Sequence, residues 1–361
     1  MAYDFFPTKI SELSKTLETK TWNNDNIMNA VSLFSYLKKQ YPTIEAPINI
    51  DTANQSMINV TRMLQGDVNL TTLKSSLKLN KIKMKFGNGS SGNRGKNNRG
   101  NMFEPEFAQA FLDWWSGKTI SNQAMLKCIE DIYKEYDLHK TNDIYVDVVG
   151  GENTRRPLTF TGNSIILANP KGSGFYVGPS VTDITLTTDS GKEIYLSLKL
   201  GGTTTFFNVG TKTILTTPEI KNNNITNQNG LTLLNTFGID PKRFCDVFNG
   251  KQIKSTERVV RNPSYKKAAI EKLLKSGIGY GYHIVHKMNS KIISKNMTEQ
   301  AMNKASQISG QYVVYYGGKT GSGKRIDVEF SSAAYDFKIN IRDTQGSTGY
   351  PTRMMCDFKY K

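Results

Sequence analysis

The clearest structural signal in the chain is the run Val181-Thr-Asp-Ile-Thr-Leu-Thr-Thr-Asp-Ser-Gly-Lys-Glu-Ile-Tyr-Leu-Ser-Leu-Lys199. Apolar and polar residues alternate on both sides of its Asp-Ser-Gly-Lys cluster, which predicts two half-buried strands joined by a turn. A turn centred on Gly191 places Asp183 opposite Lys199 on one face of this β-hairpin. A two-residue turn would slip the register by one residue, place Asp183 opposite Leu198 and mix the two faces. We therefore predict a loop with an odd number of residues.

The charge of the chain favours an anionic partner. The 361 residues include 47 Lys and Arg but only 31 Asp and Glu, which gives a formal net charge of +16. A basic excess of this size suggests nucleic acid as the first partner to consider, and a contribution to solubility alone is the alternative. The length suffices for one large domain with an appendage, or for two domains.

The three cysteines, Cys128, Cys245 and Cys356, lie far apart and show no CxxC spacing. We therefore expect neither a zinc site nor a disulfide framework. No apolar run is long enough to span a bilayer, and the first residues lack the pattern of a signal peptide. These features predict a cytoplasmic protein without a membrane partner, located in the host cell if a phage encodes it.

Composition divides the chain into three parts. Residues 1–86 show helical apolar stripes, and they are expected to form a helical N-terminal region that either contacts DNA, mediates dimerisation or simply packs on the main domain. Residues 87–101 are rich in Gly, Asn and Arg and predict a loop or linker. Residues 102–361 alternate between helical and strand-like patterns, which indicates an α/β domain with a β-rich C-terminal segment. The expected helices are 103–115, 121–136, 263–276 and 298–308, and the expected strands include 144–149, 158–168, 174–178, 311–316, 325–330 and 335–341.

The hairpin carries residue types that suit phosphodiester hydrolysis. That reaction needs a metal ion to bind the phosphate and activate water, and magnesium prefers carboxylate and carbonyl oxygens. Asp183 and Lys199 supply an acid and a cation that can assist the water. The backbone carbonyl of Leu198 offers a further oxygen. A second carboxylate must come from elsewhere, and Glu104 at the start of the 103–115 helix is the candidate.

These residues resemble the motif of the PD-(D/E)xK nuclease superfamily, which has the restriction-endonuclease-like fold. The matching features are Arg99-Gly-Asn-Met-Phe-Glu104 at the start of a helix, Asp183 on a strand and Ser197-Leu-Lys199 on its partner. The resemblance covers about residues 99–290. It implies a mixed β-sheet core flanked by helices, built in the order helix, strand, strand, strand, helix, strand. It also implies Asp183 and Glu104 as ligands of Mg2+ (or Mn2+) and Lys199 as the catalytic lysine.

One residue departs from the family pattern, because Ser197 stands where the family has a second acid. A serine hydroxyl is a poor magnesium ligand. Either a migrated acid replaces it, with Glu106, Glu193 and Asp189 as alternatives, or the site is weakened. An ordinary cross-strand ion pair between Asp183 and Lys199 is the simpler explanation that stays open.

Several basic and polar residues outside the hairpin are candidates for contacts with nucleic acid. The Gly-rich segment offers three cations along a possible phosphate path, and the chain leaving Lys199 offers an amide. The Gly-rich turn near residue 320 and the C-terminal strands offer the rest. The predicted nucleic-acid-binding residues are Arg94, Lys96, Arg99, Asn208, Lys319, Lys324, Arg325 and Arg342.

Two other motifs are interpreted as structural. Gly318-Lys-Thr-Gly-Ser-Gly-Lys324 matches most of a phosphate-binding loop, but Arg325 replaces the final Ser or Thr and a strand follows where a helix is required. We interpret it as a Gly-rich hairpin turn and not as an NTPase loop. His283 and His286 are interpreted as ordinary structural histidines, with a general base as the alternative.

Together these features predict a Mg-dependent DNA endonuclease, encoded by a phage or a mobile element. The alternative is a non-enzymatic nucleic-acid-binding or virion structural protein with a degenerate nuclease fold, for which Ser197 is the best support. DNA is the expected partner, and a homodimer is left open.

Overall fold

The computed structural model describes residues 48–51, 57–60, 82–83 and 99–361, apart from 141–143, 149–154, 163, 189, 203, 345 and 347. The described pieces of the predicted helical region are strands β1 (Ile48–Asp51) and β2 (Met57–Val60), which pair antiparallel, and β3 (Ile82–Lys83). The helical structure expected for residues 1–86 is therefore wrong for these described pieces. The other residues of 1–86 and most of the 87–101 linker lie outside the described residues.

The chain divides into two compact units. The first contains Met1–Asn153 and Thr182–Leu198, and the second contains Thr154–Val181 and Lys199–Lys361. Each combines helices with β-sheet, so the mixed α/β class predicted from the sequence is confirmed.

The first unit places two helices beside a mixed sheet whose strand order is β8, β7, β4, β3. Strand β4 pairs antiparallel with β7 and parallel with β3, and helix α4 packs against α5 and β4. The last two residues of β8 belong to the second unit. The elements are α4 (Arg99–Trp115), α5 (Gln123–Glu135), β4 (Ile144–Val148), β7 (Ile184–Thr188) and β8 (Glu193–Leu200).

Helices α4 and α5 follow from amphipathic spacing. Phe103, Phe107 and Phe111 recur every four residues on α4 and are buried. Asn122 caps α5, because its side chain accepts a hydrogen bond from the backbone N–H of Met125 at 3.1 Å. Helix α4 begins at Arg99, inside the segment predicted as linker and four residues before the expected start at residue 103.

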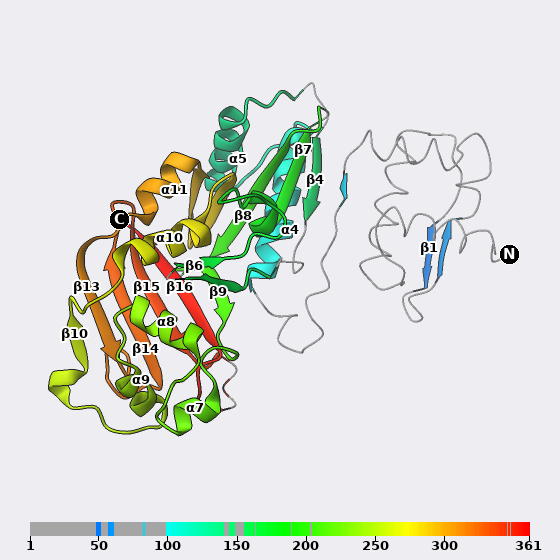
Figure 1. Ribbon diagram of the computed structural model, residues 1–361. Helices are drawn as coiled ribbons and strands as arrows, with labels where there is room; N and C mark the ends of the chain where they lie inside the picture. The colour runs from blue at the N-terminus through cyan, green and yellow to red at the C-terminus, as the bar shows by residue number, and fades with distance from the viewer. Residues whose placement is uncertain are drawn as a thin grey trace. The chain divides into compact units, whose positions relative to one another are not determined.

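The second unit is built on an antiparallel sheet with the order β10, β13, β14, β15, β16, β9. One face is apolar and is covered by helices, with α8 and α9 lying over the strands in Figure 1. The other face is polar, and it is described with the candidate site. The strands are β9 (Thr204–Gly210), β10 (Val259–Arg261), β13 (Ser309–Tyr316), β14 (Arg325–Ser331), β15 (Tyr335–Arg342) and β16 (Arg353–Tyr360).

Five further helices and one 3-10 turn belong to the second unit as described. Helix α9 begins with Asp240 as N-cap followed by Pro241, the arrangement that satisfies the first backbone N–H groups. The helices predicted at 263–276 and 298–308 are present as α10 and α11, with shifted ends. The elements are α7 (Thr217–Lys221), α8 (Gln228–Thr236), α9 (Pro241–Phe248), η1 (Ser255–Glu257), α10 (Lys267–Ile278) and α11 (Glu299–Ser306).

Two hairpins and a short helix complete this unit. The single strand predicted at 158–168 is a hairpin, because the chain turns at Gly162 with φ of +56°. The strand predicted at 174–178 is absent, and a short helix begins at Gly178 instead. The elements are β5 (Leu158–Thr161), β6 (Ser164–Leu167), α6 (Gly178–Val181), β11 (Tyr282–Met288) and β12 (Lys291–Met297).

In the part of the chain that the structure describes, no helix combines the length and apolar character that crossing a membrane requires.

Candidate functional site

The predicted hairpin is present as β7 and β8, and its loop has an odd number of residues. The backbone N–H of Thr188 donates to the carbonyl of Lys192 at 2.9 Å, so the loop lies between these two residues. Gly191 has φ of +80° and donates its N–H to the carbonyl of Thr188 at 2.9 Å. Three-residue hairpin loops have this form, with a left-handed residue after a turn. The loop is centred one residue earlier than predicted.

The shifted loop changes which residues face each other. Ile184 pairs with Leu196, and the N–H of Asp183 donates to the carbonyl of Leu196 at 2.8 Å. Continued by one residue, this register places Asp183 opposite Ser197. The predicted pairing of Asp183 with Lys199 is therefore wrong by two residues, although the alternation of faces is kept.

The Asp183 carboxylate is held by its own hairpin. The side chain is buried, and its Oδ2 accepts hydrogen bonds from the N–H of Leu198 at 2.7 Å and the hydroxyl of Ser197 at 3.3 Å. The structure thus brings together three residues of the predicted motif. Leu198 contacts the carboxylate through its N–H, whereas the sequence indicated its carbonyl as a metal ligand.

Of the other predicted site residues, the two glutamates lie on α4 and the lysine lies on β8. Glu104 is half-buried and Glu106 exposed on α4, and Lys199 lies two residues beyond Ser197 on β8, in the second unit. Among the described residues, no group of three or more His, Cys, Asp and Glu is arranged to hold a metal ion.

The two histidines of β11 are buried and bonded within the second unit. The His283 ring bonds the Ser294 hydroxyl at 2.7 Å, and His286 bonds the Gly201 carbonyl at 2.6 Å. Burial lowers the pKa of His286, the nearby charge of Lys199 lowers it further, and the bond to Gly201 opposes both. This geometry fits the structural role predicted from the sequence.

The polar face of the second sheet collects charged side chains from neighbouring strands. Lys338 lies between Glu329 on β14 and Asp357 on β16, each directly paired with it. Two residues along the strands, on the same face, Asp336 lies directly opposite Lys359. Acids and cations therefore alternate across these strands, which is the favourable arrangement for cross-strand pairs.

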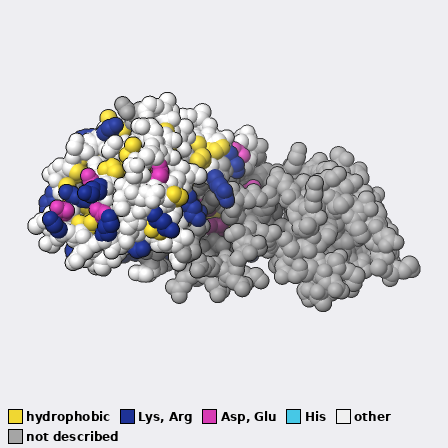
Figure 2. Space-filling view, turned by 60° about the horizontal axis from the view of Figure 1, so that its bottom comes forward, with side chains coloured by type: hydrophobic (Ala, Val, Ile, Leu, Met, Phe, Trp, Pro, Cys, Tyr) yellow, Lys and Arg dark blue, Asp and Glu magenta, His cyan; other side chains and the backbone are white. Residues whose placement is uncertain are grey.

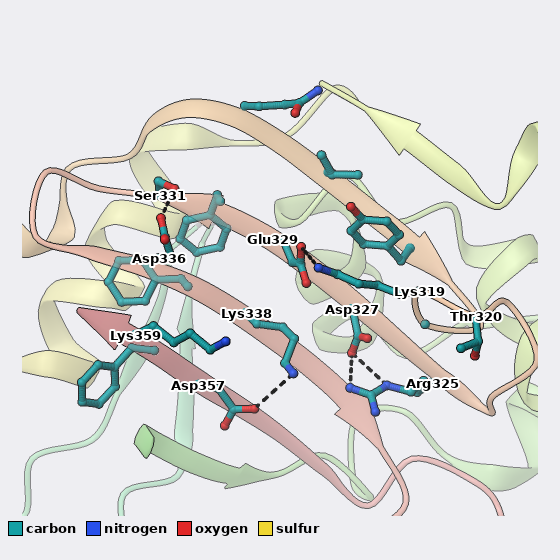
Figure 3. Close-up of a pocket in the computed structure, with 17 residues that line it drawn as sticks. Lys319, Thr320, Arg325, Asp327, Glu329, Ser331, Asp336, Lys338, Asp357 and Lys359 are labelled. Atoms are coloured by element: carbon teal, nitrogen blue, oxygen red, sulfur yellow. Dashed lines mark hydrogen bonds and ion pairs between the residues drawn. The ribbon is translucent and has the colours of Figure 1, made fainter. Parts of the chain in front are cut away.

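A pocket of about 720 Å³ lies over this face. Figure 3 shows its labelled side chains on one side of the strands, with acids and cations pointing toward one another. Lys319, from the turn before β14, bonds Glu329 at 2.9 Å, and this bond raises the pKa of the lysine. Arg325 donates to Asp327 through Nε at 2.9 Å and through a terminal nitrogen at 2.6 Å.

Three polar residues at the base of this face are buried, namely Asp327, Asn340 and Asp357. Asp357 accepts hydrogen bonds from Asn340 Nδ2 at 2.7 Å and from the Thr205 hydroxyl at 2.8 Å. Lys338 Nζ lies 3.9 Å from the same carboxylate. Asn340 Oδ1 is buried without a hydrogen-bond partner among the described residues. The face is thus a bonded network and not a set of independent surface charges.

Three arginines form a row at one end of the polar face. Arg325, Arg342 and Arg353 occupy directly paired positions on β14, β15 and β16. Like charges in such positions repel each other. Within the described residues, neither Arg342 nor Arg353 forms an ion pair, and the buried Nε of Arg342 has no hydrogen-bond partner.

The Gly-rich motif at the same end is a turn, as predicted. It joins β13 to β14, so a strand and not a helix follows it. Gly317, Gly318 and Gly321 all have positive φ values, which favour glycine. A Cβ on Gly321 would also lie 2.0 Å from Cζ of Arg258. The turn therefore keeps another guanidinium close to the end of the sheet.

The predicted nucleic-acid-binding residues are partly brought together. Asn208, Arg325 and Arg342 lie on the polar face, and Lys319 and Lys324 lie on the Gly-rich turn beside it. Arg94, Lys96 and the Arg99 side chain lie outside the described residues. Lys and Arg side chains are spread over the face drawn in Figure 2, with Asp and Glu among them, so total charge alone does not locate a site.

The sequence analysis missed the central pairs of the pocket. Their signal is a repeated tripeptide, Asp336-Phe-Lys338 and Asp357-Phe-Lys359. In a strand, the acid and the lysine of each repeat point to one face and the phenylalanine to the other. Because β15 and β16 are antiparallel, each acid is paired with the lysine of the other repeat.

No known protein family matches this chain, and no curated protein or solved structure is significantly similar to it.

Proposed function

We propose that this protein binds nucleic acid through the arginine end of the polar face. The arginine row carries the proposal, because Arg342 and Arg353 are adjacent cations without acidic partners in the described part of the chain. Phosphate groups of a nucleic acid are anions that a planar guanidinium binds through two hydrogen bonds. The net charge of +16 supports the same class of partner.

The repulsion within the arginine row is small compared with what its cations can contribute to phosphate binding. Opposed like charges on neighbouring strands are destabilising, by an amount comparable to the roughly 0.2–1 kcal/mol that favourable pairs gain. Each phosphate contact releases a counterion, which makes the slope of log binding constant against log salt concentration steeper by about 0.9 for duplex DNA. A row of cations therefore costs little stability in the free protein and contributes strongly to binding at low salt.

Salt dependence of binding tests this proposal directly. Affinity for a fluorescent DNA duplex is measured by anisotropy between 50 and ~300 mM salt for the parent and for Arg342→Gln combined with Arg353→Gln. We expect weaker binding and a log–log slope shallower by about 2, because two phosphate contacts are lost. The matched control is Arg155→Gln, since Arg155 is exposed and lies outside the sheet.

Two outcomes would refute the proposal. One is a parent protein that shows no salt-dependent binding to DNA. The other is a double variant whose slope equals that of both the parent and Arg155→Gln, which would place the contacts elsewhere.

A metal-dependent DNA endonuclease is the second candidate function. It is favoured by Asp183, whose buried carboxylate contacts Ser197 and Leu198 of the strand that also carries Lys199. Along the chain, α4, β4, β7, β8, α10 and β11 also follow the order of the restriction-endonuclease-like core, although other elements intervene. Mg2+ (or Mn2+) would be the cofactor.

Cleavage of plasmid DNA with magnesium tests this second function. We expect cutting by the parent and a loss of cutting in Asp183→Ala and Lys199→Ala. Equal cutting by all three proteins would reject these catalytic roles, and no cutting by any of them would favour the degenerate, DNA-binding alternative.

A further inference from the structure

Tyr350 lies in the connection between β15 and β16, beside the arginine row, and other elements bring polar groups around it. The Tyr350 cluster comprises Tyr350, Lys221 at the end of α7, Lys324 at the end of the Gly-rich turn, and Asn249 after α9. The Lys221 and Lys324 ammonium groups lie 5.8 and 5.7 Å from the centre of the Tyr350 ring. Lys221 and Lys324, more than a hundred positions apart in sequence, therefore contact the same aromatic ring.

Hydrogen bonds fix the ring in place. The Tyr350 hydroxyl donates to Asn249 Oδ1 at 3.2 Å, and Asn249 Nδ2 donates to the carbonyl of Ile220 at 2.7 Å. The connection itself is tied by Asp343, whose Oδ2 accepts from the N–H of Gly349 at 2.9 Å. A half-buried tyrosine anchored at its hydroxyl end presents a preset aromatic surface.

The Lys324 side chain lies along two glycines. A Cβ on Gly250 would lie 3.8 Å from Lys324 Cε, and a Cβ on Gly349 would lie 3.3 Å from its Cδ. Both glycines have positive φ values, +75° and +69°. The backbone at Gly250 and Gly349 thus packs along the Lys324 side chain, whose ammonium group lies over the Tyr350 ring.

The two lysines at the ring lack acidic partners among the described residues. By contrast, Lys251, which bonds Asn223 in the same region, also forms an ion pair with Asp246 at 2.8 Å. Within the described residues, the ammonium groups of Lys221 and Lys324 contact the Tyr350 ring, and an exposed cation–π contact is weak. Each ammonium group can leave the ring for a phosphate at little cost.

We infer that the Tyr350 cluster binds single-stranded nucleic acid, with one base stacked on Tyr350 and the flanking phosphates on Lys221 and Lys324. This inference rests on the proposed function and names the form of nucleic acid that this end of the sheet takes. An aromatic ring between lysines is the combination that proteins use for single strands, because every base has a stacking face. Duplex bases are already stacked, so a duplex contacts the lysines and arginines but gains nothing from the ring.

The experiment compares binding of single strands and a duplex. Anisotropy is measured for the full chain with oligo(dT), oligo(U) and a DNA duplex, using the parent, Tyr350→Ala, Tyr350→Phe and Arg155→Gln. We expect Tyr350→Ala to lose roughly tenfold in affinity for both single strands and less than twofold for the duplex. Tyr350→Phe should keep most single-strand affinity, because the ring remains.

The outcomes separate this inference from the proposed function. If the parent binds no nucleic acid in a salt-dependent manner, the proposed function fails and the inference fails with it. If the parent binds but Tyr350→Ala loses affinity equally for strands and duplex, or for neither, only the stacking role is overturned. A loss confined to oligo(dT) or to oligo(U) supports the ring and identifies which nucleic acid it prefers. Calorimetric unfolding of each variant shows that a lost affinity is not lost folding.

Discussion

Replacing Asp357 by Ala tests whether the polar face is a bonded network. Asp357 is buried, and its carboxylate accepts hydrogen bonds from Asn340 and from Thr205, which lies 152 positions earlier in the chain. Truncation removes the partner of both donors at once. The Thr205 hydroxyl is only half-buried, so it can turn toward water, whereas the Asn340 side chain has no exposed surface.

The size of the effect follows from the asparagine that is left behind. In the described structure Asn340 Oδ1 already lacks a hydrogen-bond partner, so the variant leaves the whole amide unsatisfied. An unsatisfied buried polar group costs about 1–3 kcal/mol. With the lost bond from Thr205, we expect the free energy of unfolding to fall by about 2–4 kcal/mol, which corresponds to a loss of roughly 4–15 °C in Tm.

Asp336→Ala is the matched control, because it truncates the same residue type in the other Asp-Phe-Lys repeat. Asp336 is exposed, and its contacts are the Ser331 hydroxyl at 2.6 Å and Lys361 at 3.7 Å. Exposed pairs contribute about 0–1 kcal/mol, so the control should lose at most a few degrees. Differential scanning calorimetry is the appropriate assay, because the described tryptophans, Trp114 and Trp115, lie in the first unit and do not report on this sheet.

A double variant isolates the unsatisfied amide. Asp357→Ala combined with Asn340→Ala removes both the carboxylate and the group that it leaves unpaired, so the double variant should lose less stability than the two single losses added together, by about 1–2 kcal/mol. Equal losses for Asp357→Ala and Asp336→Ala, or strict additivity in the double variant, would show that the buried network does not stabilise this sheet.

Two other predictions concern packing and acid stability. A Cβ on Gly277 of α10 would lie 2.2 Å from Cδ1 of Phe207 on β9. Gly277→Ala should therefore lower the free energy of unfolding, measured by urea denaturation, by about 1–3 kcal/mol. The control is Gly210→Ala, whose added Cβ meets open space and should change this free energy by less than about 0.5 kcal/mol. Hydrogen bonds from Thr226, with others from Thr216 and Asn227, lower the pKa of Glu219 to about 2. Because its folded pKa lies below the unfolded value of 4.5, its stabilisation is present above pH 4.5 and is lost as the pH falls toward 2. Glu219→Gln should therefore flatten the acid-induced fall in the free energy of unfolding over this range, by less than about 1 kcal/mol because the group is largely solvated. A pH profile of Tm identical to the parent's would contradict this.

The sequence predicted elements where periodicity was strong. Strands β13, β14 and β15 and helices α5 and α11 lie close to their expected ranges, because their apolar residues repeat with the period of one structure only. Short helices such as α8 and α9 were not predicted. Their start signals were present, with Asn227 and Asp240 as N-caps and Pro241 after the second, but each helix is too short to show a clear apolar period.

The candidate hairpin shows what a single sequence leaves undecided. Alternation fixed the two faces of β7 and β8 correctly, but two odd loops satisfy it equally, centred on Ser190 or on Gly191. The choice depends on which loop position takes the positive φ value, and in the structure Gly191 occupies the third position. That local detail moved the partner of Asp183 from Lys199 to Ser197.

The polar face could not be predicted because it depends on which strands are neighbours. The Asp-Phe-Lys repeats become reciprocal pairs only when β15 and β16 are adjacent and in the observed register. The bond from Thr205 to Asp357 needs β9 at the edge beside β16, a contact between distant parts of the chain. Residue types along one strand do not contain this information.

The polar face separates into two parts with different physical roles. In the middle, each acid of the Asp-Phe-Lys repeats faces a lysine, so this part is close to neutral and its buried members act on stability. At the end, Arg342 and Arg353 face each other without acidic partners in the described chain, and Tyr350 lies in the connection between their strands. Variants should therefore separate the two properties. Asp357→Ala should lower Tm and leave the salt slope of binding unchanged at temperatures where the variant is folded, whereas the double arginine variant should flatten that slope at nearly constant Tm. A slope that changes with Asp357, or a Tm that falls by several degrees with the arginines, would mean that binding and stability depend on the same charges.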